Sequence, residues 1–236
     1  MRIAATGDLH FGKASPGILQ PLLSQITTGA DVLLMAGDLT DYGTADEARA
    51  LAKDLAAAVR IPIVAVLGNH DFEAGAEREI YQIMVDHGVN MLDGDTWEVD
   101  GVGFAGVKGF AGGFGRRALG PWGEPIIKQF VHEAVNETLK LESALARLRT
   151  EKKIVLLHYA PIEGTVEGEP REIYPYLGCS RLEEPLGRYG VTAVIHGHAH
   201  NGALEGRTST NIPVYNVAYP LMKKTTPDHP FRVLEF

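Results

Sequence analysis

Short apolar runs rich in Val, Ile and Leu recur along the chain and constrain its fold more than any other feature. Five of these runs span residues 3–6, 32–36, 61–67, 154–157 and 191–195. Uninterrupted apolar runs of this length indicate strands buried on both faces, although periodicity alone does not exclude buried helix. Later runs lie closer together, and they predict hairpins or a second mixed sheet at residues 96–99, 103–107, 213–217 and 231–236.

Helical patterns separate the early runs. The stretch 44–59 begins with a capping box, Thr44-x-x-Glu47, and places Ala48, Leu51 and Leu55 on one face. A longer helix is predicted from about 125 to 149, with Pro125 in its first turn. Strands that alternate with helices imply an α/β layered fold with largely parallel pairing. Because no linker divides the 236 residues, we expect one domain over residues 1–236.

The composition narrows the possible partners and locations. Hydrophobic residues make up 45% of the chain and charged residues 22%, the ordinary mix of a soluble globular protein. A formal net charge of −8 argues against a nucleic-acid polymer as partner, because phosphate backbones are held by clustered Lys and Arg. No apolar run approaches the roughly 20 residues that span a bilayer. Since the first strand also leaves no room for a signal peptide, we expect a cytoplasmic protein, of an oligomeric state that the sequence does not indicate.

Five polar blocks end or directly follow the apolar runs. They are Gly7-Asp8-Leu9-His10, Gly37-Asp38, Gly68-Asn69-His70-Asp71, Leu157-His158 and Gly197-His198-Ala199-His200. Ligands of open α/β sheets bind beyond the carboxyl ends of the strands, so these blocks should converge. Taken singly, each block has an ordinary explanation, such as a helix cap for Asp38 or a satisfied core histidine for His158.

The ordered set is harder to explain by structure alone. Two carboxylates, four imidazoles and an amide, buried together, cost several kcal/mol unless something coordinates them. A mixed nitrogen and oxygen ligand set without thiolate suits Mn²⁺, iron or Zn²⁺. Seven protein ligands are too many for one catalytic ion that keeps an open position. They match two ions, about 3.5–4 Å apart, that share a bridging carboxylate.

The five blocks resemble the signature of the calcineurin-like metallophosphoesterase superfamily, D-x-H, G-D, G-N-H-[DE], H and G-H-x-H, with every block present in order. The resemblance covers nearly the whole chain and implies a sandwich of two mixed β-sheets flanked by helices. It implies that one metal is held by Asp8, His10 and His200, the other by Asn69, His158 and His198, and that Asp38 bridges the two.

The same resemblance implies a reaction. A hydroxide between the metals attacks phosphorus, and His70 stabilises the transition state or protonates the leaving oxygen. Asp71, which follows His70, is expected to orient its ring.

The implied substrate is a small phosphate ester, cleaved by a phosphodiesterase or a phosphatase. The Asn-His-Asp block and the short chain favour the cyclic-nucleotide phosphodiesterase branch. A metal-dependent nuclease is the alternative enzyme, which the acidic balance disfavours. A non-catalytic scaffold of the same fold is the alternative from another class, and no eroded ligand position supports it.

The segment 108–123 differs from the rest of the chain because it holds six glycines in sixteen residues. It is open to two interpretations, a plain surface connection or a flexible loop that folds over the metal centre. In the second interpretation, Arg116 and Arg117 bind the remote part of the substrate or a non-bridging phosphate oxygen, since a guanidinium pairs bidentately with phosphate.

Overall fold

Two mixed β-sheets form the centre of the molecule in the computed structural model, which describes the whole chain apart from the side chain of Arg117. The first sheet has the strand order β11-β1-β2-β3-β4. Four of its strands are parallel, and β11 pairs with β1 antiparallel. The bounds are β1 Arg2–Thr6, β2 Val32–Ala36, β3 Ile63–Val66, β4 Val89–Met91 and β11 Arg232–Glu235.

The second sheet has the order β5-β6-β7-β8-β10-β9. Strands β6, β7, β8 and β10 are parallel, whereas β5 and β9 each pair antiparallel with a neighbour. The bounds are β5 Asp95–Val99, β6 Val102–Val107, β7 Lys152–Leu157, β8 Ala193–His196, β9 Glu205–Arg207 and β10 Pro213–Asn216. The runs predicted at 96–99, 103–107 and 213–217 therefore belong to a second mixed sheet, as expected. The run at 231–236 does not: it forms β11, which pairs with β1 at the edge of the first sheet.

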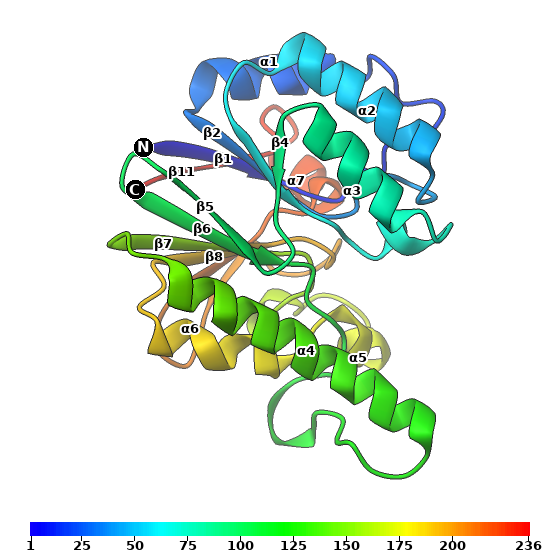
Figure 1. Cartoon of the computed structure of the whole chain (residues 1–236), viewed down its shortest axis with the longest axis vertical. Helices are drawn as coiled ribbons and strands as arrows, with labels where there is room; N and C mark the ends of the chain where they lie inside the picture. The colour runs from blue at the N-terminus through cyan, green and yellow to red at the C-terminus, as the bar shows by residue number, and fades with distance from the viewer.

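Helices cover the outer face of each sheet and complete four layers (Figure 1). The first sheet is covered by α1 (Gln20–Gly29), α2 (Ala45–Ala58) and α3 (Glu77–Asp86), and the second by α4 (Pro125–Arg147) and α6 (Glu184–Arg188). Two short helices, α5 (Tyr174–Leu177) and α7 (Tyr219–Thr225), complete the set. The predicted fold class, two mixed sheets flanked by helices, is confirmed.

Three hydrophobic clusters explain why the strand sequences are continuously apolar. One lies between the sheets and includes Ile3 and Ala5, whereas Ala4 of the same strand belongs to the cluster under the first helix layer. The third lies between the second sheet and α4. Because both faces of each central strand meet a helix layer or the other sheet, alternation of polar and apolar residues is lost.

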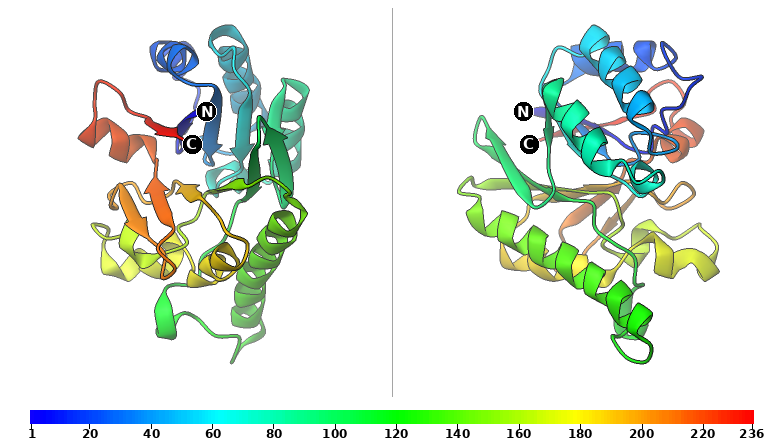
Figure 2. Two further views of the ribbon diagram at one scale, coloured as in Figure 1. Left: turned by 90° about the vertical axis from the view of Figure 1, so that its left-hand side faces the viewer. Right: turned by 45° about the vertical axis from the view of Figure 1, so that its right-hand side comes forward.

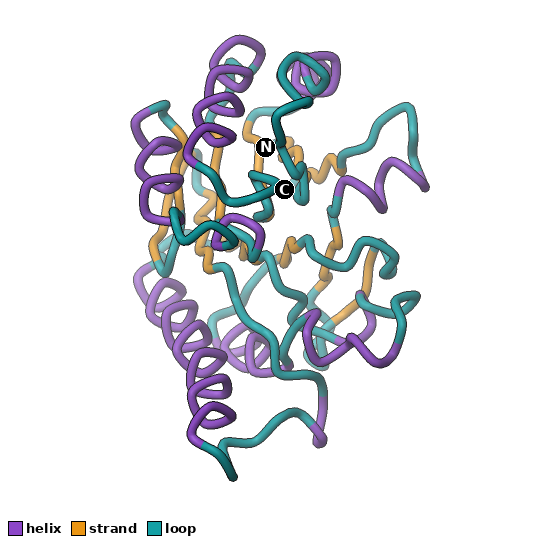
Figure 3. The backbone as a smooth tube through the Cα atoms, turned by 90° about the vertical axis from the view of Figure 1, so that its right-hand side faces the viewer, coloured by secondary structure: helices purple, strands orange, loops and turns teal.

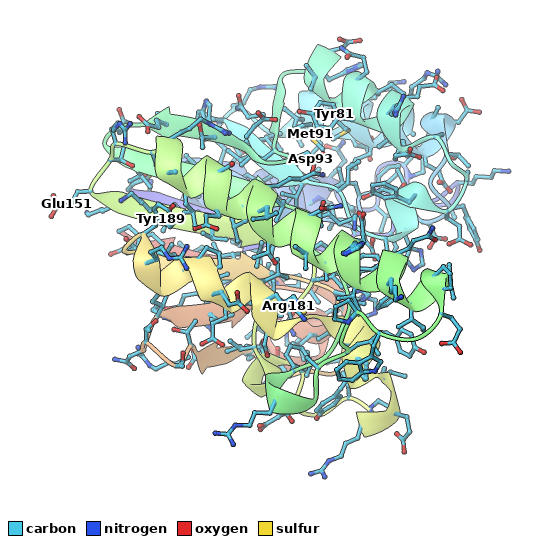
Figure 4. All side chains as sticks on the ribbon, turned by 60° about the horizontal axis from the view of Figure 1, so that its bottom comes forward. Tyr81, Met91, Asp93, Glu151, Arg181 and Tyr189 are labelled. Atoms are coloured by element: carbon cyan, nitrogen blue, oxygen red, sulfur yellow. The ribbon has the colours of Figure 1, made fainter. Side chains whose placement is uncertain are left out.

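Local signals account for the helix ends. Thr44 and Glu47 form the predicted capping box at the start of α2. Helix α4 ends at Arg147, two residues before the predicted boundary. Strands β4 and β9 were not predicted, because three residues are too few to give a pattern. Figure 4 labels Tyr81 of α3 and Met91 of β4, whose hydroxyl and carbonyl form a 3.0 Å hydrogen bond.

The two chain ends lie side by side at the edge of the first sheet, as Figures 1 and 2 show. The amino group of Met1 donates to the carbonyl of Phe236 at 2.9 Å. Among the described residues, no helix has the length and apolar content needed to cross a membrane.

Candidate metal centre

The five polar blocks meet at the edge where strands of both sheets end. They follow β1, β2 and β3 of the first sheet and β7 and β8 of the second. The loops that connect these strands gather between the two helix layers in Figure 3. All seven predicted ligand residues come together at this edge. Their side chains are Asp8, His10, Asp38, Asn69, His158, His198 and His200.

One group of donors contains Asp8, His10 and His200, with one ligand atom of each within 4.8 Å of the others. The Nε2 atom of His200 lies 3.0 Å from Oδ1 of Asp8 and 3.5 Å from Nε2 of His10. The carboxylate of Asp8 also accepts from the backbone N–H of His198 at 2.9 Å. Asp8 is therefore held in place from the opposite sheet.

A second group contains Asp38, His158 and His198, and it shares Asp8 with the first. The Nε2 atom of His158 lies 3.4 Å from Oδ1 of Asp38 and 2.8 Å from the amide oxygen of Asn69. Both Asp8 and Asp38 are 1% exposed. Oδ2 of Asp38 also lies 3.8 Å from Nε2 of His10 in the first group, so both buried carboxylates connect the two groups.

Burial and mutual contact shift the titration of these groups. Burial alone would raise the pKa of Asp8, but the hydrogen bond to His200 and the nearby imidazoles lower that pKa to about 2. Burial raises the pKa of Asp38, and the adjacent charge of Asp8 adds to the effect. Burial also lowers the pKa of His198 to about 3, which keeps the imidazole neutral and able to act as a ligand.

The backbone around the cluster is unusual. Four of the six non-glycine residues with positive φ among the described residues belong to it: Asp8 (54°), His10 (43°), Asp38 (47°) and His198 (70°). Two glycines beside the cluster are required for a steric reason. A Cβ on Gly68 would lie 2.1 Å from Oδ1 of Asp38, and one on Gly197 would lie 2.2 Å from Oδ2 of Asp8.

Three rings at the cluster are oriented by backbone carbonyls. Nδ1 of His158 lies 2.9 Å from the oxygen of Ala36, and Nε2 of His198 lies 3.1 Å from that of Tyr176. Because a carbonyl can only accept, each of these nitrogens carries the proton and leaves the other nitrogen free. His70 follows the same rule, with its Nδ1 atom 2.7 Å from the carbonyl oxygen of Asp41.

The expectation that Asp71 orients the ring of His70 is wrong. The Asp71 carboxylate is fully buried and accepts from the backbone N–H groups of Leu39 at 3.2 Å, Thr40 at 2.8 Å and Gly68 at 2.8 Å. It also accepts from the Thr40 hydroxyl at 2.7 Å. Asp71 thus joins the loop after β2 to the loop after β3, while the carbonyl of Asp41 orients His70.

Hydrogen bonds to residues 175–180 anchor the middle of the glycine-rich segment. The N–H of Gly112 donates to Pro175 O at 2.7 Å, and that of Gly113 donates to Gly178 O at 2.8 Å. A Cβ on Gly112 would lie 3.1 Å from the sulfur of Cys179, so glycine allows this close approach. The segment projects away from the sheets below α4 and α5 (Figure 1).

The structure shows no contact between Arg116 and the cluster. Arg116 lies in the 3₁₀ turn η2 (Gly115–Arg117), is exposed, and has no hydrogen bond or ion pair to the described part of the chain. The side chain of Arg117 lies outside the described residues.

Sequence reasoning missed Lys108 and Tyr159, which border the cluster. The ring of Tyr159 lies 4.5 Å from that of His198, and the ammonium of Lys108 lies 5.3 Å from the centre of the Tyr159 ring. Lys108 directly follows β6. Lys108 therefore lies at the carboxyl end of a strand, as the other site residues do. A search of every strand end in the sequence would have found it.

Comparison with known proteins places this site in context. A sequence model described as calcineurin-like phosphoesterase matches residues 1–202. The chain is 24% identical over 234 residues to a UDP-2,3-diacylglucosamine hydrolase of Xanthomonas oryzae pv. oryzae, and 23% identical over 234 residues to that of Xanthomonas axonopodis pv. citri. Each alignment covers 87% of both chains. The structure of the phosphopantetheinyl hydrolase of Mycobacterium tuberculosis is similar, with a TM-score of 0.69, 16% identity, and coverage of 98% of this chain and 95% of the other.

Proposed function

Because the chain belongs to the calcineurin-like phosphoesterase family, and is thus a phosphoric ester hydrolase, we propose that it hydrolyses small phosphate esters with the help of two metal ions. One ion would be held by Asp8, His10 and His200, the other by Asn69, His158 and His198, with Asp38 shared between them. Mn²⁺ and iron suit this ligand set, and Zn²⁺ is compatible with it.

The proposal rests on two adjacent groups of potential metal-ligand atoms. These nitrogen and oxygen atoms share too few protons to hydrogen-bond with one another. The Nε2 atoms of His10 and His200 face each other at 3.5 Å, and two buried carboxylates lie within the same cluster. The buried Nδ1 atom of His10 has no hydrogen-bond partner among the described residues. Cations would bind the facing Nε2 atoms and the buried carboxylates, so the residues present fit two metal ions. Such ions, when bound, supply Lewis acidity that activates water and neutralises phosphoryl charge.

The protein groups have distinct tasks in this reaction. The carbonyl contacts of His158 and His198 direct one unprotonated nitrogen of each ring towards the cluster. They also raise the basicity of these nitrogens, which strengthens metal binding. The carbonyl of Asp41 holds the proton on Nδ1 of His70 and leaves Nε2 available for the substrate. In its protonated form, His70 donates a proton from Nε2 to the departing oxygen of the ester.

Two features favour a small substrate over a nucleic-acid polymer. The net charge of −8 disfavours attraction of a phosphate backbone. The relatives named above are hydrolases of a UDP-sugar derivative and of a phosphopantetheinyl group, which contain small phosphate esters. The narrower assignment to the cyclic-nucleotide branch stays a prediction.

A paired substitution tests the metal centre. Asp38 and Asp100 share the same φ of 47°, and Asp100 is exposed and remote from the cluster. Asparagine tolerates this backbone conformation as aspartate does, so both variants should keep their turns. Each removes one negative charge, and only Asp38→Asn removes it from the cluster. Wild type and Asp100→Asn should retain two ions per chain by elemental analysis and hydrolyse bis(p-nitrophenyl) phosphate, whereas Asp38→Asn should lose both properties.

At most one ion per chain in the metal-replete wild type would rule out the two-metal proposal. Full activity after chelation would rule out any metal dependence.

A further inference from the structure

A groove of about 570 Å³ lies between the glycine-rich segment, the start of α4 and the turn that contains α5. Seven of its eleven lining residues are apolar or aromatic, namely Phe114, Leu119, Ile127, Phe130, Tyr174, Pro175 and Tyr176. Two glycines and the exposed charges of Glu163 and Arg171 complete the lining. Its size and lining are those of a small-molecule site.

The groove adjoins the proposed metal centre through shared backbone. Tyr176 lines the groove, and its carbonyl lies 3.1 Å from Nε2 of His198. The N–H of Ala160, two residues after His158, donates to Leu177 O at 3.0 Å. A molecule in the groove therefore contacts the turn whose Tyr176 carbonyl orients His198, a proposed metal ligand.

Exposed apolar side chains surround the groove. Trp122 is 74% exposed and Ile173 is 37% exposed, and both lie in the segments that form its walls. Tyr176 is 63% exposed. Such a concentration of exposed apolar surface at one site marks a place where an apolar ligand or partner binds.

We propose that this groove binds an alkyl or acyl chain of the phosphate ester whose phosphoryl group is cleaved at the adjacent centre, an inference that rests on the proposed function. The walls are made largely of apolar and aromatic side chains, and the charged groups among the described lining residues, Glu163 and Arg171, are exposed. A nucleobase needs hydrogen-bond partners inside its pocket, whereas a hydrocarbon chain needs only apolar contact. The anchored glycine-rich wall keeps the groove open before the chain arrives, which lowers the cost of binding.

The test uses the full metal-loaded chain and a series of p-nitrophenyl alkyl phosphates with methyl, propyl and hexyl groups, each kept below the concentration at which it forms micelles. Each methylene buried in the groove should raise kcat/KM by about fourfold until the groove is filled. Ile127→Glu introduces a charge into the groove and should flatten this dependence on chain length. Ile126→Glu makes the same change at the preceding position of α4, which is exposed and outside the lining. This variant should keep the dependence on chain length.

Leu119→Glu, on the opposite wall, provides a second variant if Ile127→Glu does not fold, as judged by Tm and metal content. Equal kcat/KM for the three wild-type reactions would overturn the groove assignment and leave the proposed function intact. The same result for Ile126→Glu and Ile127→Glu would also overturn it. If p-nitrophenyl thymidine 5′-phosphate were preferred and Ile127→Glu removed that preference, the groove would bind a nucleobase instead. Absence of hydrolysis of every ester by the two-metal protein would overturn the proposed function itself.

Discussion

Replacement of Asp71 by Asn separates a structural role from a catalytic one. The carboxylate accepts four hydrogen bonds, two at each oxygen, from Leu39, Thr40 and Gly68. The asparagine amide keeps one accepting oxygen and turns an NH₂ group towards two buried donors. Each donor left without an acceptor costs about 1–3 kcal/mol, so the two together cost about 2–6 kcal/mol.

Removal of the charge offsets part of that cost, because the ionised carboxylate is itself unfavourable at this buried site. Burial raises the pKa of Asp71, and the neighbouring charge of Asp38 adds to the effect. We therefore expect Asp71→Asn to lower the free energy of unfolding by roughly 2–4 kcal/mol, and Tm by roughly 5–15 °C for a chain of this size. Metal affinity should fall as well, since Asp38 and Asn69 lie on the two loops that Asp71 joins.

Thermal unfolding followed by circular dichroism, together with metal analysis, measures both effects. Asp54 is the matched control, because it is also buried but accepts only one backbone N–H bond, from Gly17 at 2.7 Å. Asp54→Asn should change the free energy of unfolding by at most about 1 kcal/mol. If Asp71→Asn kept the wild-type Tm and metal content but lost turnover, Asp71 would be part of the catalytic machinery and the structural argument would be refuted.

Two further predictions concern histidines at the site. His70→Ala should keep two ions per chain and lower kcat by roughly 10²–10⁴-fold, the usual contribution of a positioned proton donor; wild-type turnover of an ester with a poor leaving group would contradict this role. His196 is fully buried, with Nε2 2.8 Å from the hydroxyl of Thr165, and burial lowers its pKa from 6.5 to about 4. The unfolded chain therefore binds the proton first, so stability is complete above pH 6.5 and falls by about 3 kcal/mol as the pH drops towards 4. Denaturant unfolding at several pH values should show a shallower loss for His196→Gln, and an unchanged slope would exclude His196 as its source.

The parts of the fold that the sequence predicted are those determined by local pattern. A strand buried on both faces is continuously apolar, so β1, β2 and β7 could be recognised without knowing their neighbours. The convergence of the polar blocks followed from one rule about strand ends, and it also explains why Asn69 and His158 meet although 89 residues separate them.

The features that could not be predicted from the sequence depend on contacts between residues that are distant in the chain. Nothing near Gly112 indicates that it will lie against Pro175, and contacts of this kind with distant residues show how the segment is held. The partners of Asp71 lie on two loops, one of them about 30 residues away. Adjacency in sequence suggested His70 as its partner, and the three-dimensional pairing replaced that interpretation.

The positive φ angles at Asp8, His10, Asp38 and His198 restrict how this site could change over evolutionary time. Glycine and asparagine adopt such a conformation at low energetic cost, while the branched side chains of valine, isoleucine and threonine clash with their own backbone. A descendant that lost its metals would therefore be expected to carry Asn or Gly at these positions, because other replacements would also damage the turns. Intact sites and eroded ones can thus be told apart among related chains by reading four positions, and the backbone explains why the replacements come from so short a list.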